Sequence, residues 1–270
     1  MNIRVPDTLT IENSEKFMLS IRLCSGGLSF AGCIPSERET FFYGKVTLDR
    51  TKPYTKALKE AFFEYPFFSY TYKKVYFVLA NRQYTLVPEM VFLEKQKEEL
   101  MSFVFSSKEE KTLHNLQKDL DIEVAFSIHP EVYDFFSHTL VQPQFVHAIS
   151  PMLAFCRKQN LSCFPKQLYV AMHEDVMDSV CFDKGALIFA NSFNYNNAGD
   201  IIYYILYIWK QAGMDQMKDE LFLYANPSMS QELKDTLQNY LLKIKLLEVN
   251  ELSDSPEVPL DVKVLFECEL

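Results

Sequence analysis

The chain has only seven glycines and twelve prolines among its 270 residues, and 48% of its residues are hydrophobic. A sequence this apolar, and this poor in glycine and proline, is not of the disordered or low-complexity kind. The formal net charge is -9, and the lysines and arginines are scattered along the chain. Because no basic stripe is present to attract phosphate backbones, we expect no nucleic-acid partner.

Segments that would direct the chain to a membrane are also missing. The opening residues, MNIRVPDTLTIENSEKF, contain no basic stretch followed by an apolar run of about 7 to 15 residues, so no signal peptide is predicted. The longest apolar run lies between Ile201 and Trp209 and is too short to cross a bilayer. We therefore expect a cytoplasmic protein without membrane insertion.

Catalytic and metal-binding signatures are absent as well. The six cysteines form no CxxC pair and no Cys/His spacing of the zinc-site kind, so we expect buried free thiols, no bound metal and no cofactor. Neither GxSxG nor HExxH occurs, and the histidines at positions 114, 129, 138 and 147 have no nucleophile at a recognisable spacing.

The strongest positive signal is an internal repeat. The segment FVLANR at 77–82 returns as FLYANP at 222–227, about half the chain later. Each segment follows three predicted strands and a helix, which gives a β-β-β-α-β order twice. The predicted strands are 17–24, 27–34 and 40–49 in the first block, and 167–172, 178–182 and 186–193 in the second.

Helical spacing of apolar residues predicts the helices. In the first block the helix follows Pro53, and in the second it is Ala198 to Gln211, where Asp200 complements the helix dipole. The second helix is apolar almost all round, so we expect it to be enclosed on every side. Other predicted elements are helices at 88–105, 131–138, 145–159 and 228–241, the last opened by a Ser228–Gln231 capping box, a linker at 106–111 and a closing strand at 243–249.

Several polar or aromatic segments leave alternatives open. Gly26 and Gly27 predict a hairpin, although they could also cradle a phosphate, and His173-Glu174-Asp175 is typical of a second hairpin turn. The asparagines at 191, 194, 196 and 197 either line a site opposite Asp200 or form a loop that caps the helix. The aromatic segment PFFSYTY at 66–72 is a candidate partner-binding surface.

The duplicated order of elements resembles the ribonuclease-H-like unit doubled in the actin, Hsp70 and sugar-kinase superfamily. The chain is similar to the type IV pilus actin-like assembly protein and to the cytoplasmic domain of the type II secretion L protein. More closely, it resembles an uncharacterised bacterial family known as a domain of unknown function. The resemblance rests on NSF at 191–193, Asp200 with Tyr203 and Tyr204, LFLYAN at 221–226 and CEL at 268–270. It implies an α/β fold of two ribonuclease-H-like lobes, 1–142 and 143–270.

This superfamily binds ATP between its lobes, with an Asp and a Gly on an early hairpin of each lobe. In this chain the corresponding positions hold Arg22 and Cys24 in the first lobe, and Ala171 and His173 in the second. Paired glycines of the adenosine loop are replaced by Ala225, Asn226 and Pro227. The resemblance makes Arg22, Ser25, Gly26, His173 and Asn226 candidate residues of an inter-lobe cleft. Asn191, Asn197 and Asp200 are the candidate residues of the polar loop.

Three functions are compatible with these residues. Loss of the metal and phosphate features favours a catalytically inactive, pseudo-ATPase protein that acts as a scaffold or adaptor for an unknown protein partner. The first alternative is a nucleotide-binding ATPase or kinase with an atypical site. The second is a metal-free sensor of anions or metabolites, in which Arg22 grips a phosphate or carboxylate directly.

Overall fold

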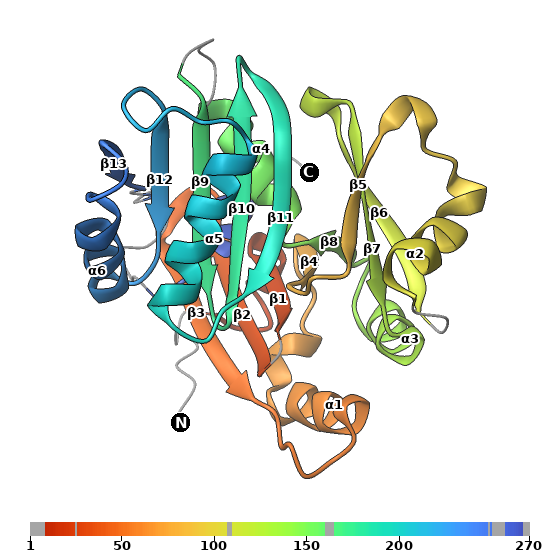
Figure 1. The fold of residues 1–270 in the computed structure, drawn as a ribbon. Coiled ribbons are helices and arrows are strands. Elements are labelled where there is room, and N and C mark those ends of the chain that lie inside the picture. Colours follow the sequence, from red (N-terminus) through yellow and green to blue (C-terminus); the bar gives the residue numbers. More distant parts are fainter. Residues whose placement is uncertain are drawn as a thin grey trace. The chain divides into compact units, whose positions relative to one another are not determined.

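The fold is that of a computed structural model, drawn in Figure 1. The structure describes residues 9–24, 26–106, 110–159, 165–247, 249 and 257–266. The chain forms two compact units: unit 1 contains residues 1–116 and 121–150, and unit 2 contains residues 117–120 and 151–269. The lobe boundary after residue 142 stays a prediction.

Unit 1 is built on a five-stranded mixed sheet with the strand order β3-β2-β1-β4-β8. Strand β1 pairs antiparallel with β2 and parallel with β4, while β4 pairs parallel with β8. The strands span Met18–Cys24 (β1), Gly27–Ile34 (β2), Glu37–Thr47 (β3), Lys74–Leu79 (β4) and Gln144–His147 (β8). The first four confirm the predicted strands. The helix predicted from residue 145 is wrong at its start, because β8 occupies residues 144–147 and α4 (Ile149–Gln159) follows it.

The predicted hairpin between β1 and β2 is confirmed, with Cys24 paired to Gly27. A Cβ atom on Gly27 would lie 2.2 Å from the carbonyl oxygen of Val46. Strand β3 can therefore approach β2 at this point only because glycine has no side chain.

Aromatic side chains fill the core beneath helix α1 (Tyr54–Glu64), which confirms the helix predicted after Pro53. The Phe62 ring stacks on Phe68 and meets Phe136 edge-on, with ring centres 5.3 and 5.5 Å away. Phe68 belongs to the short 3-10 turn η2 (Pro66–Ser69) and is fully buried, and Tyr72 is 6% exposed. The prediction that 66–72 is a partner-binding surface is therefore wrong, because these rings complete the core.

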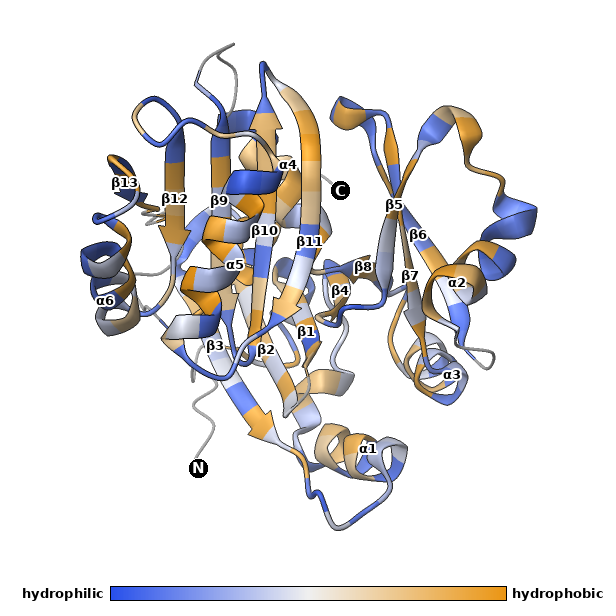
Figure 2. Cartoon of the chain, viewed as in Figure 1, coloured by the Kyte–Doolittle hydropathy of each residue, from blue (hydrophilic) through white to orange (hydrophobic). Residues whose placement is uncertain are grey.

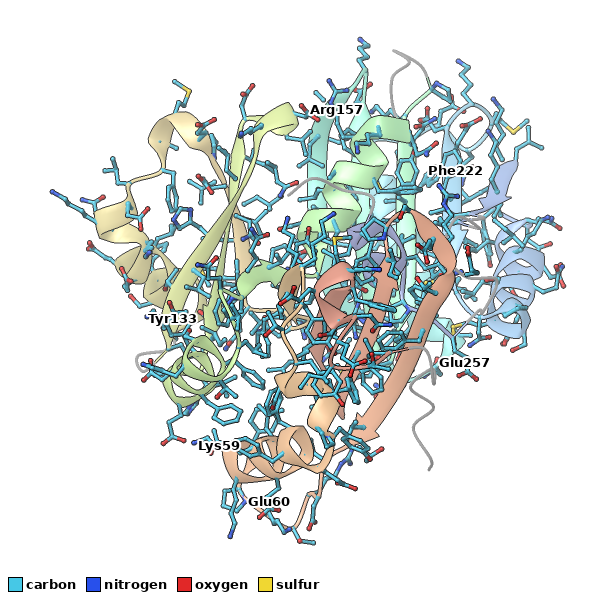
Figure 3. All side chains as sticks on the ribbon, turned by 180° about the vertical axis from the view of Figure 1, so that it is seen from behind. Lys59, Glu60, Tyr133, Arg157, Phe222 and Glu257 are labelled. Carbon is cyan, nitrogen blue, oxygen red and sulfur yellow. The ribbon has the colours of Figure 1, made fainter. Side chains whose placement is uncertain are left out.

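The outer side of α1 combines charged residues such as Lys59 and Glu60 (Figure 3) with the exposed rings of Tyr54 and Phe63. Glu60 forms an ion pair with Lys52 at 2.5 Å, and the Lys59 ammonium lies 5.4 Å from the centre of the Phe135 ring. Because these groups are near the surface, each contact contributes little to stability.

A second, three-stranded sheet is inserted in the chain between β4 and β8, with the order β5-β7-β6. The predicted helix over 88–105 is confirmed in its second half as α2 and is wrong in its first half, where the chain ends β5 and forms two 3-10 turns. The predicted linker at 106–111 falls partly outside the described residues, and Lys111 opens β6. The helix predicted at 131–138 is confirmed as α3. Elements of this region are Tyr84–Pro88 (β5), Glu89–Val91 (η3), Glu94–Gln96 (η4), Lys97–Phe105 (α2), Lys111–Gln117 (β6), Lys118–Leu120 (η5), Ile122–Ile128 (β7) and Pro130–Thr139 (α3).

Unit 2 repeats the five-stranded sheet of unit 1, with the equivalent order β11-β10-β9-β12-β13. Strand β12 lies parallel to β9 and β13, as β4 lies parallel to β1 and β8, so the repeated segments occupy equivalent places. Phe222 of β12 stacks on Tyr169 of β9 at 4.7 Å (Figure 3). The strands are Gln167–His173 (β9), Val176–Asp183 (β10), Ala186–Asn194 (β11), Glu220–Tyr224 (β12) and Lys243–Leu246 (β13).

Helix α5 (Ala198–Gln211) has the predicted bounds and covers one face of this sheet (Figure 1). The prediction that it is enclosed on every side is wrong, because Tyr203 and Tyr207 are 62% and 47% exposed. The helix is amphipathic instead, and its core-facing side consists of Ile201, Ile205, Ile208 and Trp209.

Two further helices complete unit 2. Helix α6 (Pro227–Leu237) links β12 to β13, and α7 (Leu260–Leu265) is buried along its whole length. The Tyr224 hydroxyl donates to the carbonyl of Val258 at 2.6 Å, which ties the α7 region to the end of β12. Among the described residues, no helix is long and apolar enough to cross a membrane.

Candidate functional site

A buried polar network joins β9, β10 and β11 in unit 2. His173 is 8% exposed, Asp178 5% and Ser192 2%. Nε2 of His173 lies 2.7 Å from Oδ2 of Asp178, and Nδ1 of His173 lies 3.1 Å from Oε2 of Glu174. Oδ1 of Asp178 accepts a short hydrogen bond from the Ser192 hydroxyl. Four polar side chains are thus partners of one another at the margin of an apolar sheet.

Strand register brings these residues together. Asp178 lies directly opposite Ala171 on β9 and opposite Ser192 on β11. His173 is two residues beyond Ala171 and therefore points to the same face of the sheet. The His173–Asp178 contact is a diagonal cross-strand pair, which long side chains can span.

The arrangement of hydrogen bonds favours a structural role over nucleophilic catalysis. Both ring nitrogens of His173 lie within hydrogen-bond distance of carboxylate oxygens, Nδ1 of Glu174 and Nε2 of Asp178, so the ring is occupied by these two side chains. A serine nucleophile needs a neutral imidazole as its base. Here Ser192 donates to the Asp178 carboxylate instead, and His173 contacts the other oxygen of the same carboxylate.

The turn beside the network confirms the predicted hairpin, because Glu174 and Asp175 connect β9 to β10. Glu174 adopts a left-handed backbone with φ of 46°, which is uncommon for a residue with a side chain. Tyr195 holds this turn from beyond β11: its hydroxyl donates to the Glu174 carbonyl at 2.8 Å, and its amide donates to the Asp175 carbonyl at 3.0 Å. The turn between β9 and β10 is therefore held by the residue that follows the neighbouring strand β11.

The candidate polar loop beside α5 caps that helix. The Asn197 side-chain oxygen accepts from the Asp200 amide at 3.1 Å, and Asp200 Oδ2 accepts from the Asn196 amide at 2.8 Å. This exchange differs from a standard capping box in that Asp200 accepts from Asn196, the residue before the N-cap Asn197. The side-chain oxygen of Asn191, on β11, accepts from the Ser192 amide at 2.8 Å. Local bonds account for these polar side chains, and a ligand site there stays a prediction.

Asn226, the candidate residue after β12, is the N-cap of α6. Its side-chain oxygen accepts from the Met229 amide at 3.0 Å and from the Ser228 hydroxyl at 2.9 Å. The predicted Ser228–Gln231 capping box is therefore wrong, because Asn226 stands one position outside Pro227, which opens the helix. Pro227 has no amide hydrogen, and the amides of Met229 and Ser230 already have Asn226 as acceptor, which leaves fewer donors for a phosphate.

In unit 1 the candidate residues lie on the β1–β2 hairpin. The Arg22 side chain is fully buried, within β1 and opposite Ser29 of β2. Gly26 has open space where a side chain would project, and Ser25 lies outside the described residues. Arg22 and Gly26 belong to unit 1, whereas His173 and Asn226 belong to unit 2, so their assembly into one cleft stays a prediction.

The family assignment comes from a comparison of the sequence with family models. The model of the family described as "Protein of unknown function (DUF3822)" matches residues 6–244. The chain belongs to this family. A search of curated proteins finds no match to the sequence.

Solved structures define the fold of this DUF3822 chain. A Bacteroides thetaiotaomicron protein described as having an "actin-like ATPase fold and unknown function" is 28% identical, with a TM-score of 0.82, over 97% of this chain and 100% of the other. A structure of the "PilM-PilN type IV pilus biogenesis complex" is 10% identical, with a TM-score of 0.56, over 93% and 98% of the two chains. The chain therefore has the actin-like ATPase fold, with a duplicated ribonuclease-H-like unit.

The residues of the DUF3822 chain fit a magnesium nucleotide poorly. Mg²⁺ needs carboxylate or water oxygens, and Asp178 is the acidic side chain of the second hairpin's core. Both of its oxygens are already engaged, and the position opposite it is the buried Ala171. In the first hairpin the buried Arg22 carries a charge of the same sign as the metal.

Asp178 and Ser192 were not predicted as site residues from the sequence. The available signal was the presence of two polar residues, Asp178 and Ser179, inside an apolar strand. Their partners are set by the register of three strands, which the sequence pattern leaves open.

Proposed function

We propose that this protein is a non-catalytic, pseudo-ATPase member of the actin-like fold, and that it acts as a scaffold or adaptor through protein–protein contacts. The observation that carries the proposal is that both oxygens of the Asp178 carboxylate already have partners, His173 and Ser192. Replacing either partner with a hydrated metal would leave a buried polar group without its hydrogen bond.

Two further observations support a binding role. The PilM structure of the same fold is that of a complex with PilN, so a protein of this architecture meets a protein partner. Residues that shape the fold, such as the α5 and α6 caps, are present although the nucleotide features are not.

We also propose that the protein works in the bacterial cytoplasm. The relative of 28% identity comes from Bacteroides thetaiotaomicron, which supports a bacterial origin. Two of the described cysteines, Cys33 and Cys181, are buried thiols outside any disulfide. Unpaired thiols are typical of a reducing compartment.

Isothermal titration calorimetry with Mg-ATP tests the pseudo-ATPase proposal. We expect no binding heat in the titration. In a separate phosphate-release assay we expect no ATP hydrolysis above that of a heat-denatured sample. A dissociation constant near 1 μM, which corresponds to about -8 kcal/mol, would contradict the proposal and favour the alternative of an atypical ATPase or kinase.

The anion-sensor alternative is favoured by one observation, a fully buried arginine on the first hairpin. Its test is stabilisation by inorganic phosphate or citrate in EDTA. Because the Arg22 guanidinium is closed to solvent, we expect no shift in melting temperature. A shift that Arg22→Met abolishes would instead establish a metal-free anion site.

A further inference from the structure

The inserted region of unit 1 exposes an unusual share of large apolar side chains. The described residues contain seventeen exposed large hydrophobic residues, and five of them fall between positions 90 and 104. They are Met90 (91% exposed), Val91 (59%), Leu93 (58%), Phe103 (85%) and Val104 (44%). We call residues 89–105 the η3–α2 segment. Figure 2 shows its apolar stretches on α2 and on the chain that leads from β5 into α2.

The first half of the η3–α2 segment is anchored to the inserted sheet. The Phe92 ring lies 4.9 Å from the ring of His114 on β6. Glu94 contacts Nε2 of His114 at 2.9 Å and the Lys97 ammonium at 2.8 Å. Nδ1 of His114 in turn lies 3.0 Å from Glu123 on β7. Phe92 and Glu94 anchor the backbone to β6. The exposed side chains of Met90, Val91 and Leu93 therefore lie on an ordered part of the surface.

Helix α2 is anchored in the same way. Met101 is 2% exposed and is the buried residue of the helix. Phe103 lies two residues further, about 200° around the helix axis, and therefore on the opposite side. A phenylalanine that is 85% exposed on an anchored helix loses contact with water only when a partner covers it.

The charge of the η3–α2 segment indicates the kind of partner. It contains four glutamates and two lysines, a net charge of -2. One glutamate and one lysine, Glu94 and Lys97, are paired with each other. Glu98 and Glu99 are exposed and form no ion pair with any described residue. Glu99 is one helical turn before Phe103, so the carboxylate and the ring share a face.

The insertion is also what distinguishes the two repeats. In unit 2 the chain passes from β12 to β13 through α6 alone, whereas in unit 1 it passes from β4 to β8 through three strands and two α-helices. The five-stranded sheets and their covering helices account for the fold of both units. The insertion adds surface beyond what that shared core requires.

We propose that the η3–α2 segment is a docking surface for a basic, apolar peptide segment of a protein partner. Met90, Leu93 and Phe103 are the apolar anchors, and Glu98 and Glu99 pair with lysines or arginines that flank the partner's own apolar residues. Aromatic and methionine anchors beside charged groups are the usual composition of such surfaces. This assignment names the partner chemistry of the scaffold role proposed above, and it rests on that role.

Selection from a phage-displayed library of random 16-residue peptides on the full-length protein tests the proposal. We expect enriched peptides to combine aromatic or aliphatic residues with lysine or arginine. Synthetic copies should bind Phe103→Ala and the double variant Glu98→Gln/Glu99→Gln roughly tenfold more weakly or worse. Phe63→Ala, which removes another exposed phenylalanine on α1 (63% exposed), is the matched control and should bind as the wild type does.

Several outcomes would overturn the assignment. These are the absence of any enriched peptide, enrichment without basic residues, or equal binding to Phe103→Ala and to the wild type. A dimer in sedimentation that Phe103→Ala dissolves would show that a second copy occupies the surface, and co-sedimentation with anionic vesicles would point to a membrane. Circular dichroism and melting temperature confirm that each variant folds. The peptide experiments contain no nucleotide, so they are independent of the calorimetry. Mg-ATP binding found by calorimetry would contradict the pseudo-ATPase proposal and would not affect the peptide-binding result.

Discussion

At the scale of single residues, the contact between His173 and Asp178 contributes to the cohesion of unit 2. Asp178 is buried, and it is the common partner of the His173 ring and the Ser192 hydroxyl. Removing this buried carboxylate leaves both groups without their hydrogen-bond partner. The effect on stability should then exceed that of an exposed ion pair several-fold.

Asp178→Asn should therefore lower the free energy of unfolding by about 3 to 5 kcal/mol, as measured by urea unfolding at pH 7. Asp175→Asn makes the same chemical change on the exposed turn of this hairpin and should stay within about 0.5 kcal/mol of the wild type. Equal effects of the two substitutions would contradict the network described here.

Burial also controls the chemistry of the cysteines. It raises the pKa of the Cys33 and Cys181 thiols from 9.0 to about 12. Because the thiolate is the reactive form, iodoacetamide at pH 8 should label Cys24, which is partly exposed, well before either of these. Peptide mass spectrometry of native and urea-unfolded samples measures the difference. Fast native labelling of Cys181 would contradict its burial.

The same shifts predict how stability depends on pH. In the folded state both thiols keep their protons up to about pH 12, whereas in the unfolded chain they lose them near pH 9. The unfolded state therefore binds fewer protons in this range. Stability should be unaffected by these groups below pH 9 and should fall as the pH rises from 9 towards 12. A Cys33→Ala/Cys181→Ala variant should show a weaker fall.

At the scale of elements, helix α5 is packed against its sheet on one side and exposed on the other. Ile208 is 2% exposed and packs in the core of unit 2, so Ile208→Ala should cost about 2 to 5 kcal/mol through lost burial and a residual cavity. Ile188→Ala on β11, where the side chain is 46% exposed, is the matched control and should cost less than about 1 kcal/mol. Urea unfolding measures the loss of unfolding free energy in both variants. Equal losses would contradict the packing of Ile208 in the core of unit 2.

The start of α6 offers a second comparison within one element. Asn226→Ala should cost about 0.5 to 2 kcal/mol, because the Met229 amide loses its acceptor. Ser228→Ala removes only a hydroxyl that donates to Asn226 and should change stability by less than about 0.5 kcal/mol. The opposite order would restore Ser228 as the cap.

Sequence patterns were sufficient where one period ran through a whole element. The strands from Met18 to Thr47 and from Gln167 to Asn194, and the helix from Ala198 to Gln211, were predicted because alternation and helical spacing are unambiguous there. The second sheet was missed because β6 reads KTLHNLQ, which is too polar to show a core face. At 88–105, apolar residues recur as in one long helix, but Met90 and Phe103 face solvent. Periodicity shows which residues share a face, and only the neighbouring elements decide whether that face is covered.

At the scale of the whole molecule, two copies of one sheet are combined with hairpins that lack the expected acidic residues. The first copy has a buried arginine in its hairpin and the second has a buried alanine opposite an engaged aspartate. Under the proposed pseudo-ATPase role, this chain keeps the elements that build the fold without those that bind a nucleotide. The sequence indicated the missing acids at Arg22 and Ala171, but it did not indicate that Asp178 lies opposite Ala171 and is already engaged by His173 and Ser192.

Restoring an acid in either hairpin should therefore fail to create a nucleotide site. Arg22→Asp and Ala171→Asp each place a carboxylate where the wild-type side chain is 0% or 2% exposed, so each should lower the melting temperature of the full chain. A ligand at about 100 times its dissociation constant would stabilise the folded state by about 2.7 kcal/mol, which thermal unfolding detects easily. We expect Mg-ATP to produce no such stabilisation in the wild type, in either single variant or in the double variant. If Arg22→Asp unfolded at the wild-type temperature and gained stability from Mg-ATP, the first hairpin would be an open phosphate site that lacks only its acid, and the non-catalytic role proposed for this protein would rest on a single substitution.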